Sequence, residues 1–493
     1  MPLEGDVPYG ADGRSSDDRS RWHAGRSSRR VVSMALVPTS DVPFLWIETP
    51  SSPTSFIALE IFRLPDGAGP DVLDEIYAGM TDESKVKQGF RRRPYRSVAT
   101  GGQYAWAEDA KLHMSKHVIR HVLPRPGRMR DLLEYVGKLH STLLDRSRPL
   151  WEGHLVEGLE DNRFALLTKA SHAYYDGINM TRHLLNGFST DATATNCTAP
   201  WIISEQKPSV AAVSKPEESS SGPGQIVDAG KAVAGSIGAF VKAGRSAVRD
   251  RDLTVPFTAP DTILNQKVDS SRRFAGDAWP IERLRKVARA AGTTSNDVAM
   301  SMCGSALRAY LAERNALPSR SLVAMVPVSL SGTAIQSAAK EGNTFGAALC
   351  RLGTELSDPM ERLQKIHTQM KRFKKLMANL DATSAQIYST LNMMSVMVVT
   401  IPGMRPLPRP GFNLVVSNVP GIRHQLYYNG CALTDFYPVS VVLDGQGLNM
   451  TMMSYLDQLA FGLVSCDKTV PHLQRMLVHL ESGIAALEDA VGL

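Results

Sequence analysis

The chain has 493 residues, of which 43% are hydrophobic and 21% are charged, values typical of an ordinary globular protein with several domains and not of a disordered chain. The net charge of +6 is mild, and no domain-sized basic stripe indicates nucleic acid. Five scattered cysteines without a CxxC pair argue against a disulfide framework or a zinc site and are typical of a reducing cytosol.

The N-terminal residues 1–33 are rich in Arg, Asp, Ser and Gly and contain no apolar stretch of the kind that a secretory signal needs. Their acids also argue against a mitochondrial presequence. We therefore expect a disordered extension. The longest apolar stretch, residues 391–404, is interrupted by polar residues and is shorter than the roughly 18 residues of a membrane span, so we interpret it as a buried helix end.

Residues 34–205 form the predicted N-terminal half. Apolar patterns there predict strands over residues 56–62, 117–124, 154–159 and 164–170, and helices over residues 71–80, 129–144 and 178–188. The last of these strands runs directly into the loop Ser171-His172-Ala173-Tyr174-Tyr175-Asp176-Gly177, which precedes a helix. A polar loop between a strand and a helix is a common position for a functional site.

Residues 206–224 are rich in Ser, Pro, Glu and Lys and predict a linker. Residues 225–251 predict an amphipathic crossover helix whose basic face is either solvated or in contact with a membrane, and the first interpretation is favoured. In the C-terminal half, residues 252–493, we expect a strand over residues 321–328 and helices over residues 281–291, 296–314 and 360–379. Alternating strands and helices in both halves predict an α/β protein.

His172 is the sharpest catalytic candidate, because an imidazole can accept a proton near neutral pH. Asp176 and Gly177 complete the pattern H-x-x-x-D-G, in which the carboxylate could orient the loop or cap the next helix and the glycine would allow a tight turn. From these six residues alone, a loop histidine beside an Asp-Gly turn is the favoured interpretation.

Several other chemistries are excluded or disfavoured. The sequence has no G-x-S-x-G elbow, no Walker loop and no G-x-G-x-x-G after a strand. His113, His117 and His121 are spaced as metal ligands on a helix would be, but the alternating sequence predicts a strand, which would separate their rings. The basic runs at residues 91–93 and 371–375 are interpreted as solvated surface.

Further sequence blocks accompany His172 in a fixed order. They lie at residues 41–50, 145–152, 157–159, 294–298, 325–329, 342–343, 417–421, 448–455 and 461–463. Together with the loop of His172 they resemble the signatures of the bacterial wax ester synthase/acyl-CoA:diacylglycerol acyltransferase family, and the resemblance covers residues 34–493. In the family motif H-H-x-x-x-D-G, the first histidine is replaced here by Ser171.

The resemblance implies a fold of two CoA-dependent acyltransferase-like domains, each a mixed sheet with helices, with the active site in the cleft between them. It implies transfer of a fatty acyl group from acyl-CoA to the hydroxyl of diacylglycerol, forming triacylglycerol, or of a long-chain alcohol, forming a wax ester. His172 would be the general base, with no acyl-enzyme. No metal or organic cofactor is expected, because acyl-CoA enters as a substrate.

Supporting roles follow from the matching blocks. Ser171, Asp176 and Gly177 would support the motif, and Asn296, Asp297 and Ser417 are candidates to position the oxyanion or the substrate. An alternative for Asn296 is a helix N-cap, with Asp297 in the first turn of the helix.

The lipid substrates imply a cytoplasmic protein that contacts a membrane or lipid-droplet surface peripherally and binds no nucleic acid. Two alternatives stay open. Ser171 suggests a non-catalytic lipid-binding paralogue. A related acyltransferase with another acceptor is the second alternative, and the blocks at residues 145–152 and 294–298 weigh against it.

Overall fold

A computed structural model describes most of the chain, namely residues 35–204 except 39, 40, 70 and 176, residues 254–329 and 345–379, residues 388 and 392, and residues 409–493. The predicted extension, the linker and the amphipathic helix lie outside the described residues, as does the apolar stretch at 391–404 apart from Asn392. The chain divides into two units, Met1–Ser33 and Met34–Leu493, and both predicted halves belong to the second.

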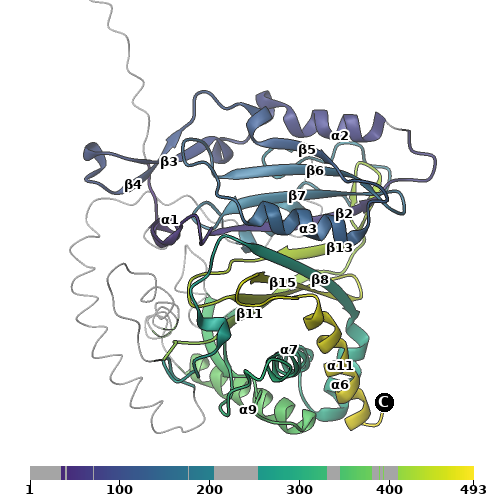
Figure 1. The fold of residues 1–493 in the computed structure, drawn as a ribbon. Helices are drawn as coiled ribbons and strands as arrows, with labels where there is room; N and C mark the ends of the chain where they lie inside the picture. Colours follow the sequence, from purple (N-terminus) through teal and green to yellow (C-terminus); the bar gives the residue numbers. More distant parts are fainter. Residues whose placement is uncertain are drawn as a thin grey trace, which may run out of the picture. The chain divides into compact units, whose positions relative to one another are not determined.

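A six-stranded sheet forms the centre of the N-terminal half (Figure 1). Its strands are Ser55–Arg63 (β2), Val118–Val122 (β5), Trp151–Leu159 (β6), Arg163–Ser171 (β7), Tyr427–Tyr428 (β12) and Cys431–Val439 (β13). They are ordered β12-β13-β2-β7-β6-β5 and are antiparallel except for β5 with β6. β2 is central and buried on both faces, which explains its nearly continuous apolar sequence.

A second six-stranded sheet forms the centre of the C-terminal half. Its strands are Arg272–Pro280 (β8), Val323–Ser329 (β9), Phe345–Arg351 (β10), Leu414–Ile422 (β11), Leu448–Tyr455 (β14) and Gln458–Cys466 (β15). They are ordered β10-β9-β11-β14-β15-β8, and the sheet is mixed, because β11 lies parallel to both of its neighbours. The fold is therefore α/β with mixed sheets, as the resemblance implies.

Helices cover the outer faces of both sheets, except α3, which lies on the side of the N-terminal sheet that faces β8 (Figure 1). They are Asp71–Thr81 (α2), Met129–His140 (α3) and Gly177–Leu185 (α4) in the N-terminal half, and Ile281–Ala291 (α6), Ser295–Ala312 (α7), Pro359–Ala378 (α9) and Arg475–Ala490 (α11) in the C-terminal half. α2 and α4 share a core with one face of β2, whereas α3 packs at the opposite face. None of the helices in the described part of the chain has the length and apolar character that crossing a bilayer would need.

The two sheets share one hydrophobic core between them. It combines Ile57, Leu59 and Ile61 of β2 with Phe274 of β8 and Val464 of β15. At one point β13 and β15 approach so closely that a Cβ built at Gly462 would lie 1.8 Å from the carbonyl oxygen of Pro438, so only glycine fits there.

The division into two halves at residues 206–251 does not anticipate where β12 and β13 lie. They belong to the C-terminal half in sequence, yet β13 pairs along β2, with Val439 opposite Ile57. Without this pairing, β2 would be an open edge of an apolar sheet, which proteins avoid.

Most predicted elements are confirmed within a few residues, and one helix is shorter than predicted. The helix predicted over residues 129–144 ends at His140, with Ser141 as its C-cap. Leu144 instead joins a small core with Leu45 and Leu150. Its apolar side chain continues the helical pattern by chance, because tertiary packing and not helical periodicity buries it.

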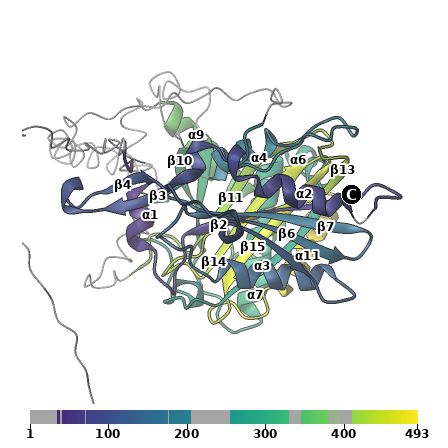
Figure 2. The same cartoon turned by 90° about the horizontal axis from the view of Figure 1, so that it is seen from above.

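A small sheet and a short helix near the N-terminus were not predicted from the sequence. The sheet contains Ala35–Leu36 (β1), Arg92–Arg96 (β3) and Tyr104–Glu108 (β4), in the order β1-β4-β3. The helix is Val42–Ile47 (α1), with a proline in its first turn. Both views place α1 beside β3 and β4 (Figures 1 and 2).

Candidate active site

His172 lies in the turn that follows β7. Ser171 is the last residue of β7, is 1% exposed, and pairs with Ser55 of β2. Its Oγ accepts a hydrogen bond from the backbone N–H of Ala173 at 3.3 Å, and its carbonyl oxygen accepts from the N–H of Tyr174 at 2.9 Å. Ser171 therefore stabilises the turn that presents His172.

The ring of His172 is flanked by two aromatic rings. Phe44 stacks on it with ring centroids 5.1 Å apart and an interplanar angle of 19°, and Phe56 lies 5.0 Å away at 60°. Burial lowers the pKa of His172 from 6.5 to about 4, because the charged imidazolium loses hydration. Among the residues that the structure describes, none forms a hydrogen bond with a ring nitrogen of His172. The imidazole is therefore neutral at pH 7.

Two of the sequence blocks meet beneath His172. Arg146 donates to Oε2 of Glu48 at 3.1 Å, and this ion pair joins the block at residues 145–152 to the block at residues 41–50. Oε1 of Glu48 accepts from the backbone N–H of Thr54 at 3.1 Å and from its hydroxyl at 3.0 Å. The carbonyl oxygen of Thr54 in turn accepts from the backbone N–H of His172 at 3.2 Å. These contacts fix the backbone of His172.

Lys169 of β7 anchors that strand to the end of α3. The sequence analysis did not identify it. It is fully buried, and its Nζ donates to the carbonyl oxygens of Leu139 and Thr142 and to Oγ1 of Thr142, at 2.8–2.9 Å. Burial lowers its pKa to about 8. A lysine inside an apolar strand pattern was the available signal, since lysine is almost never fully buried without partners.

The structure describes only part of the motif. Asp176 lies outside the described residues, so its expected supporting role stays a prediction. Gly177 is the first residue of α4, consistent with a turn between β7 and that helix.

Asn296 and Asp297 lie in the first turn of α7. The alternative that Asn296 caps this helix is wrong, because Thr294 is the N-cap and forms a capping box with Asp297. Oδ2 of Asp297 also accepts from Nδ1 of His367 at 2.8 Å, a partner that the sequence did not indicate. The carboxylate of Asp297 is thus committed to holding the start of the helix.

β11 brings a second amide to Asn296. Nδ2 of Asn418 donates to Oδ1 of Asn296 at 3.0 Å, so the blocks at residues 294–298 and 417–421 meet. The Nδ2 group of Asn296 has one weak acceptor, the sulfur of Met300 at 3.5 Å, and keeps N–H capacity for another group. Ser417 lies next to Asn418 and pairs with Thr451 of β14. No hydrogen bond within the described residues links His172 to this group, and its position relative to a cleft stays a prediction.

The three histidines considered as metal ligands are separated, as expected for this sequence. His117 stacks on the buried Trp151 and contacts its carbonyl oxygen through Nδ1 at 2.8 Å, whereas His121 stacks on Tyr135. His113 is exposed. Within the described ranges, no cluster of His, Cys, Asp or Glu side chains could hold a metal ion.

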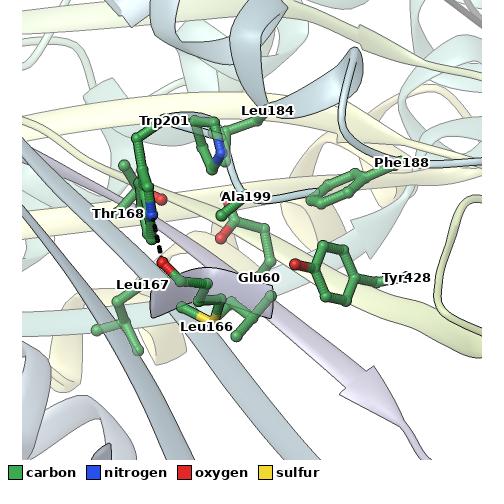
Figure 3. Close-up of a pocket in the computed structure, with 11 residues that line it drawn as sticks. Glu60, Leu166, Leu167, Thr168, Leu184, Phe188, Ala199, Trp201 and Tyr428 are labelled. Carbon is green, nitrogen blue, oxygen red and sulfur yellow. Dashed lines mark hydrogen bonds between the residues drawn. The ribbon is translucent and has the colours of Figure 1, made fainter. Parts of the chain in front are cut away.

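A buried carboxylate faces a small cavity on the α2 and α4 side of β2 (Figure 3). Glu60 is fully buried, and neither of its carboxylate oxygens has a hydrogen-bond partner among the residues that the structure describes. Besides Glu60, the cavity is lined by Thr168, Tyr428 and apolar residues. Its volume of about 10 Å³, counted for the centre of a water molecule, leaves room for roughly one water. Burial raises the pKa of Glu60 well above 4.5. The cavity lies within the N-terminal half, and the sequence reasoning did not identify it.

Comparisons with known proteins show which proteins the chain resembles. Residues 37–299 match the wax ester synthase/diacylglycerol acyltransferase catalytic domain, and residues 341–488 match the WS/DGAT C-terminal domain. The chain is 40% identical over 464 residues to a probable diacylglycerol O-acyltransferase of Mycobacterium tuberculosis, covering 93% of this chain and 100% of that protein. It is 35% identical over 462 residues to the O-acyltransferase WSD of Acinetobacter baylyi, covering 92% and 96% respectively.

Solved structures give the same result. The wax ester synthase/diacylglycerol acyltransferase of Marinobacter aquaeolei superposes with a TM-score of 0.74 at 34% identity, covering 93% of this chain and 100% of that chain. The first condensation domain of the calcium-dependent antibiotic synthetase shares the fold, with a TM-score of 0.54 at 13% identity and coverage of 93% and 96%. The chain therefore belongs to the wax ester synthase/diacylglycerol acyltransferase family.

Proposed function

We propose that the protein transfers a fatty acyl group from acyl-CoA to the hydroxyl of diacylglycerol, and also to long-chain alcohols, with His172 as the general base. The observation that carries this proposal is the neutral, apolar-enclosed imidazole of His172 in the family motif. Relatives named diacylglycerol O-acyltransferase and O-acyltransferase WSD support the substrate classes.

The reaction needs one base and no covalent enzyme intermediate. A ring nitrogen of His172 takes the proton of the acceptor hydroxyl as its oxygen attacks the thioester carbonyl carbon. The tetrahedral intermediate then breaks its carbon–sulfur bond, and the imidazolium returns the proton to the CoA thiolate. Such general-base catalysis contributes about 10²–10⁴-fold. The low pKa of His172 favours rapid return of the proton, because the imidazolium is poorly hydrated in its site.

The developing oxyanion requires a hydrogen-bond donor. Asn296 is the stronger candidate, because Asn418 already occupies its oxygen and thereby orients its Nδ2 group. The hydroxyl of Ser417 is a second candidate donor. Asp297 is an acceptor engaged with Thr294 and His367, so we assign it to positioning the first turn of α7. No metal or organic cofactor enters this mechanism.

The acceptors are lipids, and the protein must reach them. We propose peripheral contact with a membrane or lipid-droplet surface from the cytoplasm. A diacylglycerol can then pass from the lipid phase to His172 without full exposure to water, which avoids the cost of hydrating its acyl chains.

The test uses the purified full chain with radiolabelled palmitoyl-CoA and either diacylglycerol or hexadecanol in vesicles, followed by thin-layer separation. We expect label in triacylglycerol and wax ester with the wild type and with His113→Ala, which changes an exposed histidine outside the site. We expect a loss of at least about 10²-fold with His172→Ala. A wild type that binds lipid but transfers no label would refute the proposal and support the non-catalytic alternative suggested by Ser171.

A further inference from the structure

The C-terminal half of helix α9 carries exposed lysines without acidic partners. Lys371, Lys374 and Lys375 are exposed, and none of them forms a hydrogen bond or an ion pair within the described residues. Glu361, in the first turn, is the one acid of this helix. Charges of one sign gathered on a surface attract ligands of the opposite sign. This end of α9 therefore has an excess of positive charge that an anionic ligand would neutralise.

Two of the lysines lie on the same side of α9 as His367. An α-helix turns by about 100° per residue, so Lys371 and Lys374, four and seven residues after His367, lie within about 40° of it around the helix axis. The buried side chains of α9, among them Ile366 and Phe373, lie on the face that packs against the core. The two lysines thus form a row with His367 beside the buried face.

Hydrogen bonds on this side of the helix show where the row faces. Nδ1 of His367 lies 2.8 Å from Oδ2 of Asp297, in the first turn of α7. Three residues earlier in α9, and on the same side, Nε2 of Gln364 donates to the carbonyl oxygen of Ala291 at 2.8 Å. Ala291 is the last residue of α6. The row of His367 and the two lysines therefore lies on the side of α9 that faces the junction of α6 and α7.

Helix α9 extends past the start of α7. Asp297 contacts His367, whereas Gly304, further along α7, lies against Arg362, since a Cβ built at Gly304 would be 3.2 Å from Cδ of Arg362. The two helices therefore run antiparallel, side by side in the C-terminal half (Figure 1). The residues that follow His367 lie beyond the first turn of α7, and Lys374 is about 10 Å further along the helix axis.

Acyl-CoA carries its negative charges far from its reacting carbon, because the pantetheine arm separates the thioester from the diphosphate and the 3′-phosphate. Asn296, the candidate donor to the oxyanion, lies in the first turn of α7 next to Asp297. A protein that holds the thioester at Asn296 has to neutralise the phosphates at a distance from it. The row on α9 begins beside that turn and continues away from it for about 10 Å, as such a substrate requires.

We propose that Lys371 and Lys374, flanked by Lys375, bind the phosphate groups of the acyl-CoA substrate. Each ammonium group is a point charge with three donors, and phosphate oxygens accept charge-assisted hydrogen bonds from it. The inference rests on the proposed function and deepens it, because it assigns a site to the acyl donor. Lysines in the last turns of a helix also stabilise the helix through its dipole, so the experiment has to separate substrate binding from stability.

The experiment compares two acyl donors with the purified full chain. Octanoyl-CoA carries the phosphates, whereas octanoyl-N-acetylcysteamine has the same thioester without them. For the double variant Lys371→Gln/Lys374→Gln, we expect KM for octanoyl-CoA to rise about 20-fold, at about fivefold for each lost ion pair, with kcat nearly unchanged. KM for octanoyl-N-acetylcysteamine should stay at the wild-type value. High salt should raise the wild-type KM for octanoyl-CoA and change that of the variant much less.

Two variants serve as controls. Lys138 is exposed on α3, and its Nζ lies 3.7 Å from Oε1 of Glu134, so its charge already has a partner. Lys138→Gln should leave KM for both donors unchanged. Lys371→Arg/Lys374→Arg keeps both positive charges and should stay close to the wild type with octanoyl-CoA.

Binding of CoA itself, measured by isothermal titration calorimetry, separates this inference from the proposed function. His172→Ala should bind CoA like the wild type while losing acyl transfer. Equal CoA binding by the wild type and Lys371→Gln/Lys374→Gln would overturn the phosphate site and leave the proposed function intact. The same rise in KM for both donors would also overturn it, because the lysines would then act on the fold and not on the phosphates. A wild type that binds CoA through the lysines but transfers no acyl group would contradict the proposed function alone.

Discussion

The environment of His172 makes a quantitative prediction about the pH dependence of catalysis. Burial lowers its pKa from 6.5 to about 4, a difference that corresponds to roughly 3 kcal/mol between the two protonation states. A general base must be neutral, so activity should be lost only as the pH falls through the pKa of the folded protein. We therefore expect the acid limb of kcat/KM near pH 4 and not near 6.5.

Phe44 is the residue through which this prediction can be tested. Its ring covers one face of the imidazole at 5.1 Å, and Phe56 approaches from a second direction. Phe44→Ala should admit water to one of the two covered sides and raise the pKa of His172 by about one unit, roughly half of the difference from its ordinary value. The acid limb should move upward by the same amount. Phe44→Leu keeps an apolar cover, so its limb should stay near that of the wild type.

The assay is kcat/KM measured from pH 3.5 to 8 with a short-chain acyl-CoA and a soluble alcohol, which reports the free enzyme and avoids lipid binding. Circular dichroism at each pH establishes that the variants remain folded. An acid limb of kcat/KM near pH 6.5 in the wild type would show that the imidazole is hydrated and would refute the reasoning. The same limb in Phe44→Ala and the wild type would show that Phe44 does not desolvate His172.

Three further predictions concern stability. Glu60→Gln should be as stable as the wild type below pH 4.5 and more stable above it, by up to about 1.4 kcal/mol per pH unit, because the raised pKa means that folding requires Glu60 to retain a proton. Equal urea midpoints of the variant and the wild type at both pH 5 and pH 7 would contradict this. Lys169→Met should lower the free energy of unfolding by about 3 kcal/mol, since three oxygens lose a charged donor, and a change below about 0.5 kcal/mol in urea unfolding would be inconsistent with the buried contacts. Ser171→Ala should cost about 1 kcal/mol by removing the bond to the N–H of Ala173, and an unchanged thermal midpoint would exclude that role.

Much of the fold follows from local patterns in the sequence. The strand predicted at residues 56–62 is β2, and the helix predicted at residues 281–291 has the bounds of α6. The first segment is a nearly continuous apolar run, and the second has a strong helical apolar period and ends at Gly292 in the left-handed conformation. Short elements with weak periodicity were missed, among them the six-residue α1, whose structure depends on packing against residues distant in the chain.

The candidate site was likewise predicted only in part from the sequence. The motif and its order along the chain identified His172, because a base needs a histidine and the family blocks are collinear with it. The sequence could not indicate that Phe44 encloses the ring, that Arg146 pairs with Glu48, or that His367 bonds to Asp297. Each of these contacts joins segments far apart in the chain.

The sequence by itself determined most of the elements, the family and the candidate for the base, since these depend on residue types and their spacing. Only the tertiary structure decided which strand closes the N-terminal sheet and how the imidazole is charged. β13 crosses from the C-terminal half to cover the edge of β2, and two aromatic rings displace water from His172. Edge pairing and desolvation arise from groups brought together in space, so local sequence carries no direct signal of either.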